Sequence, residues 1–326
     1  MSHRTRIVLP LAGLLALVAG TAARQPVPPE VVDGWRNYTA LFSHASGDYT
    51  ATSTMRQGQE SSGQEAQVAF AFTSRCKRVE VVETVTGRAK PSKRVIYSNP
   101  KYAFRLDPGK NGWLWREVVL VGDEPSKALG VLHDQVDAWL SGVHCLASVQ
   151  RTRLLELTDD LRRIEPRPGQ PPTFVLDKER NLKEGPNTIT YHKLSLQLDA
   201  DHDHTVRTVK ADMLMNRSAG TLEISVTQQT IAGTPVPVQS VVREVYPAAS
   251  GDMEIATDTA FRIDPTVELP DQEFTLTAYG LPEPVGITWS KPTPRYLWFL
   301  VAAGVFIAIA VGFRFLARRR AARLAS

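Results

Sequence analysis

Two apolar segments, one near each end of this 326-residue chain, constrain its organisation more than any other feature of the sequence. The first segment, residues 7–18, follows Arg4 and Arg6 and precedes a run of small residues that ends at Ala23, which is the layout of a secretory signal peptide. An apolar run of this length is too short to span a hydrocarbon core of about 30 Å. We therefore expect residues 1–23 to be a signal peptide cleaved near Ala23, with an uncleaved N-terminal anchor as the alternative.

The second segment, residues 296–313, is apolar throughout, carries no charge and has about the minimum length for a membrane-spanning helix. Tyr296 and Trp298 stand at its start, where aromatic side chains favour the membrane interface. Basic residues that flank a span stay in the cytoplasm, and five follow this one: Arg314, Arg318, Arg319, Arg320 and Arg323. We expect a single-pass cell-membrane protein with a periplasmic N-terminal ectodomain and a cytoplasmic basic tail at residues 314–326.

The formal net charge of +4 and the pI of about 9.1 come from the two ends of the chain. Residues 1–24 and 314–326 hold eight arginines and no acidic residue, and subtracting these eight charges from +4 leaves −4 for the region between them. A mildly acidic domain does not provide the basic surface that nucleic-acid phosphates require. We therefore exclude a nucleic-acid partner.

The region between the two apolar segments is long enough, at about 270 residues, to bury a hydrophobic core without disulfide support. Residues 24–30 are rich in proline and predict a linker, and residues 286–295 predict a stalk before the membrane. We expect the ectodomain to occupy residues 31–285. A further proline-rich run at residues 166–172 is either a loop within this domain or a boundary between two domains.

The chain has two cysteines, Cys76 and Cys145. An even pair in an exported protein permits a disulfide bond. Sequence spacing does not show whether the two Cα atoms approach within bonding distance, so two buried, reduced thiols are the alternative.

Apolar periodicity predicts one helix followed by strands in the first part of the domain. Val31, Trp35, Tyr38 and Phe42 recur at three- and four-residue steps, which places them on one face of a helix. From Tyr49 onward the period changes to two. The expected strands are residues 49–52, 67–72, 79–85, 94–97 and 102–106, and Trp113–Trp115 completes a hairpin after the turn at residues 107–112.

The second part of the domain predicts a helical insertion and then an antiparallel meander. Helical spacing begins after Ser126, a helix-capping residue, and continues to Ile164. The meander consists of strands at residues 194–198, 206–213, 222–226 and 236–245. Pro235 and Pro237 favour an edge position for the last of them, because proline cannot donate to a strand ladder. Residues 274–278 predict one more short strand.

These elements predict an α+β fold in which a strongly curved antiparallel sheet, shaped like half a barrel, packs on a few helices, followed by one transmembrane helix. The order of elements over residues 31–246 resembles the bacterial lipoprotein carriers of the LolA/LolB type. This resemblance implies a concave apolar face that can hold acyl chains. Those carriers are soluble or lipid-anchored, and the predicted membrane span of this chain argues against a shuttling role.

Two short stretches, Tyr97–Phe104 and Leu276–Pro284, resemble segments of uncharacterised exported single-pass proteins of the planctomycete type. No activity follows from that resemblance.

Aromatic residues in the predicted strands are the candidates for a ligand cavity, because sites for apolar ligands are concave and mainly aromatic or aliphatic. These candidates are Phe70, Phe72, Tyr102, Phe104, Trp113 and Trp115. The alternative is that they form ordinary core, which a domain of this size needs.

Polar clusters in the sequence give little support for catalysis. His202 and His204 could share one face of a strand, but Asp203 between them points away, so we favour a solvated hairpin turn over a metal site. His133, Asp134 and Asp137 fit an exposed helix face. No nucleophile elbow, nucleotide-binding loop or zinc-protease motif occurs. We predict a protein that is not an enzyme, with no catalytic residues, no bound metal and no cofactor.

The sequence therefore predicts a non-catalytic, membrane-anchored protein of the cell envelope whose ectodomain binds a lipid, a lipoprotein-like ligand or an envelope protein partner. The first alternative is a structural or interaction module whose concave face is filled by its own side chains. A metal-dependent hydrolase that uses His202 and His204 is the second alternative.

Overall fold

The computed structural model describes most of the chain between residues 24 and 287. The described ranges are 24–88, 90–109, 112–121, 127–150, 152–164, 173–177, 179–184, 187–215, 218–247 and 251–287, together with Ala303, Phe306, Ile307 and Ile309. The chain divides into two compact units, Met1–Leu281 and Pro282–Ser326. The helices and strands described below all belong to the first unit.

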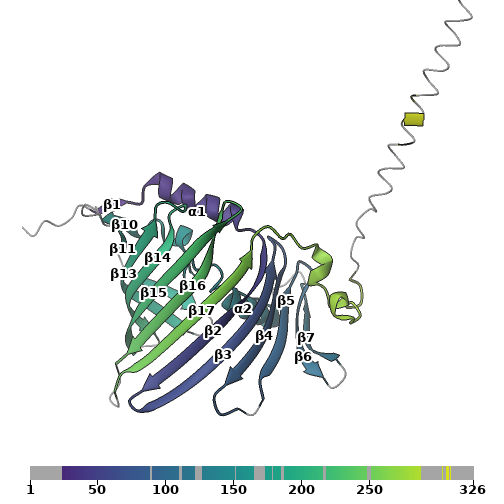
Figure 1. The fold of residues 1–326 in the computed structure, drawn as a ribbon, viewed down its shortest axis with the longest axis horizontal. Coiled ribbons are helices and arrows are strands. Elements are labelled where there is room, and N and C mark those ends of the chain that lie inside the picture. The colour runs from purple at the N-terminus through teal and green to yellow at the C-terminus, as the bar shows by residue number, and fades with distance from the viewer. Residues whose placement is uncertain are drawn as a thin grey trace, which may run out of the picture. The chain divides into compact units, whose positions relative to one another are not determined.

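One large antiparallel sheet dominates the first unit (Figure 1). Its described strands follow the spatial order β1-β10-β11-β13-β14-β15-β16-β17-β2-β3-β4-β5-β6-β7, and β12 also pairs with β13. Their bounds are β1 Arg24–Pro26, β2 Ala45–Gln57, β3 Glu60–Phe72, β4 Lys77–Val85, β5 Ser92–Ser98, β6 Tyr102–Gly109, β7 Gly112–Leu120, β10 Leu161–Ile164, β11 Thr173–Leu176, β12 Arg180–Glu184, β13 Asn187–Asp199, β14 Thr205–Met215, β15 Ser218–Ile231, β16 Thr234–Tyr246 and β17 Met253–Asp264. A separate hairpin pairs β8 (Ser148–Val149) with β9 (Thr152–Arg153).

Two helices pack on one face of this sheet, which curves around them (Figure 1). Helix α1 (Pro29–Leu41) begins with proline at its first position, where the missing N–H costs nothing, and packs on β14 and β16. Helix α2 (Lys127–Leu140) packs on β4 to β7. We call this the helix-covered face and the opposite one the outer face. The predicted α+β class, the curved antiparallel sheet and the meander of β13 to β16 are confirmed.

The predicted α1 stripe forms part of one continuous core. Val31, Trp35, Tyr38 and Phe42 are all buried in the cluster that also takes Leu132, Val136 and Leu140 from α2. Burial alternates along the strands that contact this cluster: in β3, Val68 and Phe70 are buried, whereas Gln67 and Ala69 are exposed. An antiparallel sheet with one covered face produces this alternation.

Residues 199–204 form the predicted hairpin turn, in which Ala200 and Asp201 are exposed, while Asp203 and His204 pack against α1. The indole Nε1 of Trp35 donates a 2.8 Å hydrogen bond to the carbonyl oxygen of His204. Gly34 lets the turn approach, because a Cβ atom at that position would lie 2.8 Å from the carbonyl oxygen of Asp203. Asp203 and His204 both adopt positive φ angles, 53° and 55°, in this tight turn.

Strand β16 lies inside the sheet, between β15 and β17, so the predicted edge position was wrong. Its pairing with β17 begins only at Gln239, opposite Ala260. Pro235 and Pro237 precede that point and pair with β15 alone. The missing proline N–H groups are tolerated because this part of β16 has a neighbour on one side only.

Several other segments differ from the expected elements. Residues 274–278 are not a strand but belong to two short 3₁₀ helices, η2 (Asp271–Phe274) and η3 (Leu276–Tyr279), the second ending at Gly280 with a φ of 70°. The helical pattern after α2 ends in the 3₁₀ helix η1 (Leu154–Leu157) and strand β10. Residues 24–30, expected as a linker, contain β1 and the first residues of α1.

The predicted segments at both ends lie almost entirely outside the described residues. These are residues 1–23, the flanking residues Tyr296 and Trp298, and the tail arginines Arg314, Arg318, Arg319, Arg320 and Arg323. Of the predicted span, only four helical positions are described, including Phe306 and Ile307, whose side chains are exposed. Within the described ranges, no helix has both the length and the hydropathy needed to cross a bilayer.

We predict that Gly34→Ala lowers the free energy of unfolding by about 1–2 kcal/mol, because the added methyl group meets a backbone carbonyl that cannot move independently. Gly130→Ala in α2 is the matched control: no atom lies within 4 Å of the position its Cβ would take, and a solvent-facing helical Gly→Ala change stabilises by up to about 1 kcal/mol. Urea unfolding followed by tryptophan fluorescence checks both values. Equal effects of the two substitutions would contradict the docking of α1 on the turn.

Candidate functional site

The five described aromatic candidates for a cavity are divided between the two faces of the sheet. Phe70 and Phe72 are buried on the helix-covered face, where the ring of Phe72 meets that of Phe42 with centroids 5.4 Å apart. Phe70 pairs across strands with Val79, and Val79 pairs with Ile96. Because neighbours in a strand face opposite ways, Tyr97 points to the outer face.

Tyr102, Phe104 and Trp113 belong to the outer face. Phe104 lies opposite Tyr97 in the register of β5 and β6, and their rings stack with centroids 4.5 Å apart. Trp113 meets Tyr279 edge to face at 5.8 Å. The side chain of Trp115 lies outside the described part of the chain. The candidates therefore do not line one common cavity.

The segment that follows β17 covers the outer-face aromatic residues. We call residues 270–281, which include η2 and η3, the clasp. Phe274 and Leu276 of the clasp are fully buried, and the backbone N–H of Leu276 donates a 3.0 Å hydrogen bond to the hydroxyl of Tyr102. The hydroxyl of Tyr97 donates to that of Tyr279. Tyr97, Tyr102 and Phe104 thus form a second, smaller core on the outer face.

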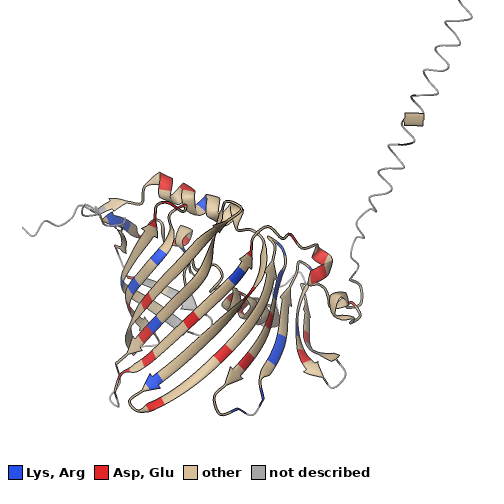
Figure 2. Ribbon diagram, in the orientation of Figure 1, with Lys and Arg blue, Asp and Glu red and all other residues tan. Residues whose placement is uncertain are grey.

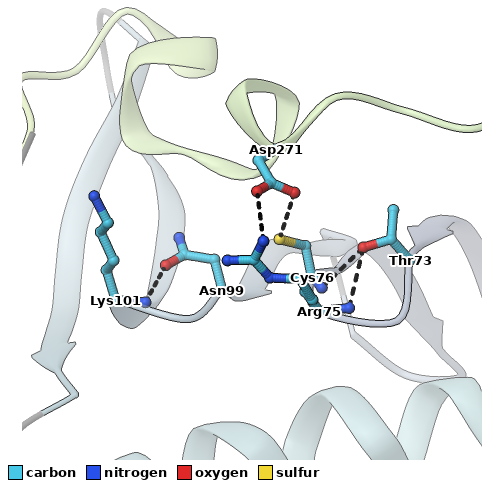
Figure 3. A network of polar contacts seen from close by, with 6 residues as sticks. All are labelled: Thr73, Arg75, Cys76, Asn99, Lys101 and Asp271. Atoms are coloured by element: carbon cyan, nitrogen blue, oxygen red, sulfur yellow. Dashed lines mark hydrogen bonds and ion pairs between the residues drawn. The ribbon is translucent and has the colours of Figure 1, made fainter. Parts of the chain in front are cut away.

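Asn99 connects the clasp to the turn between β5 and β6. Its side-chain oxygen accepts hydrogen bonds from the backbone N–H groups of Lys101 (Figure 3) and Tyr102, at 2.9 and 3.0 Å. Its amide nitrogen donates to the carbonyl oxygen of Phe274 at 2.9 Å. One buried amide therefore satisfies three backbone groups that burial would otherwise leave unpaired.

Both cysteines are free thiols, so the disulfide bond that the sequence allowed is not formed. Cys76 Sγ donates to Asp271 Oδ1 of the clasp at 3.5 Å, and Arg75 approaches the other carboxylate oxygen at 3.8 Å (Figure 3). Burial and the nearby Asp271 carboxylate raise the pKa of Cys76 to about 12. Burial raises the pKa of Cys145 to about 12 as well. Neither thiol is an activated nucleophile, because the thiolate is the reactive form.

The helix-covered face changes character along strand β2. Ala45 and Tyr49 are buried beside the helices, whereas Met55, farther along the same face, is 44% exposed. Met55 lies opposite Ile255, and Ser53 opposite Thr257, whose hydroxyl it meets at 2.6 Å. We call this region the floor: Ala51, Ser53, Met55, Gln64, Ile255 and Thr257. It lies on β2, β3 and β17, between the sheet regions on which α1 and α2 pack.

A polar group borders the floor on the α2 side. Gln64 Nε2 donates to Glu83 Oε1 at 2.7 Å, and Glu83 forms an ion pair with Arg94. The guanidinium group of Arg94 lies 5.6 Å from the ring centroid of Trp139, an α2 residue. Arg94 Nε is buried and has no hydrogen-bond partner among the described residues. The floor therefore has small and apolar side chains at its centre and a charged pair at its border.

The histidine clusters do not form a metal site in the described ranges. His202 Nδ1 lies 3.1 Å from Asp199 Oδ2 within the turn, and His204 Nδ1 is buried without a partner there. The hydroxyl of Ser98 lies 3.4 Å from the ring nitrogens of His133. No group of three or more His, Cys, Asp or Glu side chains in the described ranges has the geometry to hold a metal ion.

The outer face of the central strands is polar. A shallow hollow there is lined by Thr50, Thr52, Gln239, Arg243 and Asp258, among others. Acidic and basic residues are interspersed along the strands (Figure 2).

Neither a family model nor a curated protein matches the sequence. The structural neighbours include a DUF1329 family protein from Desulfovibrio piger, with 12% identity, a TM-score of 0.31, and 78% of this chain and 99% of that chain covered. An outer-membrane lipoprotein-sorting protein domain from Vibrio parahaemolyticus matches with 11% identity, a TM-score of 0.38, and coverage of 76% and 97%. Lipovitellin matches with 9% identity, a TM-score of 0.28, and coverage of 69% and 26%. These likenesses are weak, and nothing about function rests on them.

The second neighbour bears the name of the lipoprotein-sorting proteins that the order of elements resembles. The resemblance to planctomycete-type exported proteins finds no support in these comparisons.

We predict that Asn99→Ala releases the clasp, because it removes the buried hydrogen bond to the carbonyl oxygen of Phe274 and those from the N–H groups of Lys101 and Tyr102, and a lost buried partner costs about 1–3 kcal/mol. Limited proteolysis should then cut within residues 270–281 at a lower protease concentration. Arg75→Ala is the control: this exposed side chain makes only a long contact with Asp271, so its loss should change stability by less than about 1 kcal/mol. If protease cut residues 270–281 of the Asn99→Ala protein no more readily than those of the wild type, this role of Asn99 would be contradicted.

Proposed function

We propose that this chain is a non-catalytic protein of the cell envelope that binds an acyl chain, from a lipid or a lipoprotein, on the floor of its helix-covered face. The floor is the observation that carries the proposal. It continues the buried core along β2 without a change of face, yet Met55 at its far end is 44% exposed. A strip on which Ala51, Met55 and Ile255 continue a core toward solvent is suited to an elongated apolar ligand.

The size of the floor side chains supports the same proposal. Ala51, Ser53 and Thr257 are small and half-buried, so the sheet carries less side-chain volume there than beside Phe70 and Tyr49. The partly buried Val242 and Met253 flank the strip. An acyl chain lying on this strip would remove their apolar surface from water, at about 25 cal/mol per Å².

The chemistry of the buried titratable groups supports a non-catalytic role. The pKa of each cysteine is raised to about 12, and burial lowers the pKa of His144 to about 4. A thiol nucleophile needs a lowered pKa, and a general base needs a pKa near the working pH, and these three groups have neither.

We also propose that residues 296–313 anchor the protein in the cell membrane, with the domain in the periplasm and the tail in the cytoplasm. The uncharged apolar run and the arginines that follow it support this proposal. Washing membranes at alkaline pH should leave the full-length protein in the pellet, whereas a variant truncated before residue 288 should be released. Release of both proteins would rule out the anchor.

Tryptophan substitutions on adjacent residues of β2 test the ligand proposal. Ser53→Trp fills the floor, so it should weaken saturable uptake of a fluorescent fatty acid at least tenfold in full-length protein held in nanodiscs. Thr52→Trp is the matched control, since Thr52 points to the outer face, and its affinity should stay within about twofold of wild type.

Thermal unfolding of both variants shows whether the domain is intact. Equal binding by the wild type, Ser53→Trp and Thr52→Trp proteins would contradict a ligand on the floor. Absence of saturable uptake by the wild type would favour the alternative, a structural or interaction module that holds no apolar ligand.

A further inference from the structure

His144 occupies the junction where the ends of three elements meet. It follows the last turn of α2, where its N–H donates to the carbonyl oxygen of Leu140 at 3.2 Å. Its ring lies between Phe42, the residue after α1, and Phe72, the last residue of β3, with centroid distances of 5.6 and 5.0 Å. A single titratable side chain therefore joins both helices to the sheet.

The surroundings of this imidazole favour its neutral form. Among the described residues, Lys77 of β4 and Arg153 of β9 disfavour a positive charge on the ring, and the carboxylate of Asp137 on α2, which forms a 2.5 Å ion pair with Lys77, favours one. Burial, then Lys77 and Arg153, lower the pKa of His144 to about 4, and Asp137 opposes this shift. A proton added here places a positive charge in a site that burial withholds from water.

We propose that His144 is an acid-sensitive latch: proton uptake separates the ends of α1 and α2 from β3 and so opens the helix-covered face. The proton comes from solvent, and it stabilises the open state because the exposed imidazole binds it more tightly than the closed one does. The proposal rests on the position of His144 and is independent of any ligand on the floor.

The direction of the pH effect follows from the two pKa values. With the junction open, the imidazole has its usual pKa near 6.5, and with the junction closed the pKa is about 4. The open state therefore binds more protons between these values. The closed state is most favoured above pH 6.5 and loses its advantage as the pH falls toward 4, where the open-to-closed ratio should be on the order of a hundredfold higher.

Amide hydrogen exchange on the full-length protein in detergent micelles tests the latch. After correction for the intrinsic pH dependence of exchange, peptides covering residues 38–42, 72–77 and 140–147 should lose protection between pH 7 and pH 4.5 before the peptides of β13 to β15 do. His144→Phe and His144→Gln, which cannot take up the proton, should remove this selective loss while the carboxylates of the protein still titrate.

The control is His133→Gln, which removes another histidine of the same helical region, one that lies beside Ser98. It should keep the selective loss of protection. Two results would overturn the latch: no selective opening of the three segments in the wild type, or the same acid-induced opening in whichever of the two His144 variants folds.

Discussion

The alternation of side chains along each strand is the constraint on which the rest of this structure depends. Every residue of the sheet faces either the helices or the outside, and a shift of one residue would exchange the two sets. The helix-covered face collects Val68, Phe70 and Tyr49 together with the stripe of α1 and the apolar face of α2. Among the described residues, α1 packs on β14 and β16 and α2 on β4 to β7, and the floor lies on the strands between them.

Alternation also places apolar side chains on the outer face, and there the clasp covers them instead of a helix. Over most of the sheet this face is polar, but on β5 and β6 it carries Tyr97, Tyr102 and Phe104, which the clasp shields from water. A segment of two 3₁₀ helices can do this because side-chain groups satisfy its backbone, Asn99 above all. The clasp is also the last part of the first compact unit, immediately before the chain continues toward the predicted membrane segment.

Local patterns predicted the elements whose periodicity is strong, including α1, the strands around Phe70 and Phe104, and the meander. They missed β17, because its central residues Ala256, Thr257, Asp258 and Thr259 show no apolar alternation, although it joins the two halves of the sheet by pairing with β16 and β2. Phe274 and Leu276 are two residues apart and both buried, which is also the pattern of a strand, but they belong to two 3₁₀ helices. Pairing across the sheet decides which face a strand side chain occupies. The sequence alone therefore could not show that Phe72 and Tyr102 lie on opposite faces.

Photo-crosslinking measures most directly whether the floor of the helix-covered face holds an acyl chain. A fatty acid with a diazirine near its methyl end, activated in the presence of the full-length protein, should label peptides of β2 and β17 at residues 51–55 and 253–257, and excess unlabelled fatty acid should compete. Labelling confined to the outer-face residues of these strands or to the clasp, or labelling that does not saturate, would contradict the account.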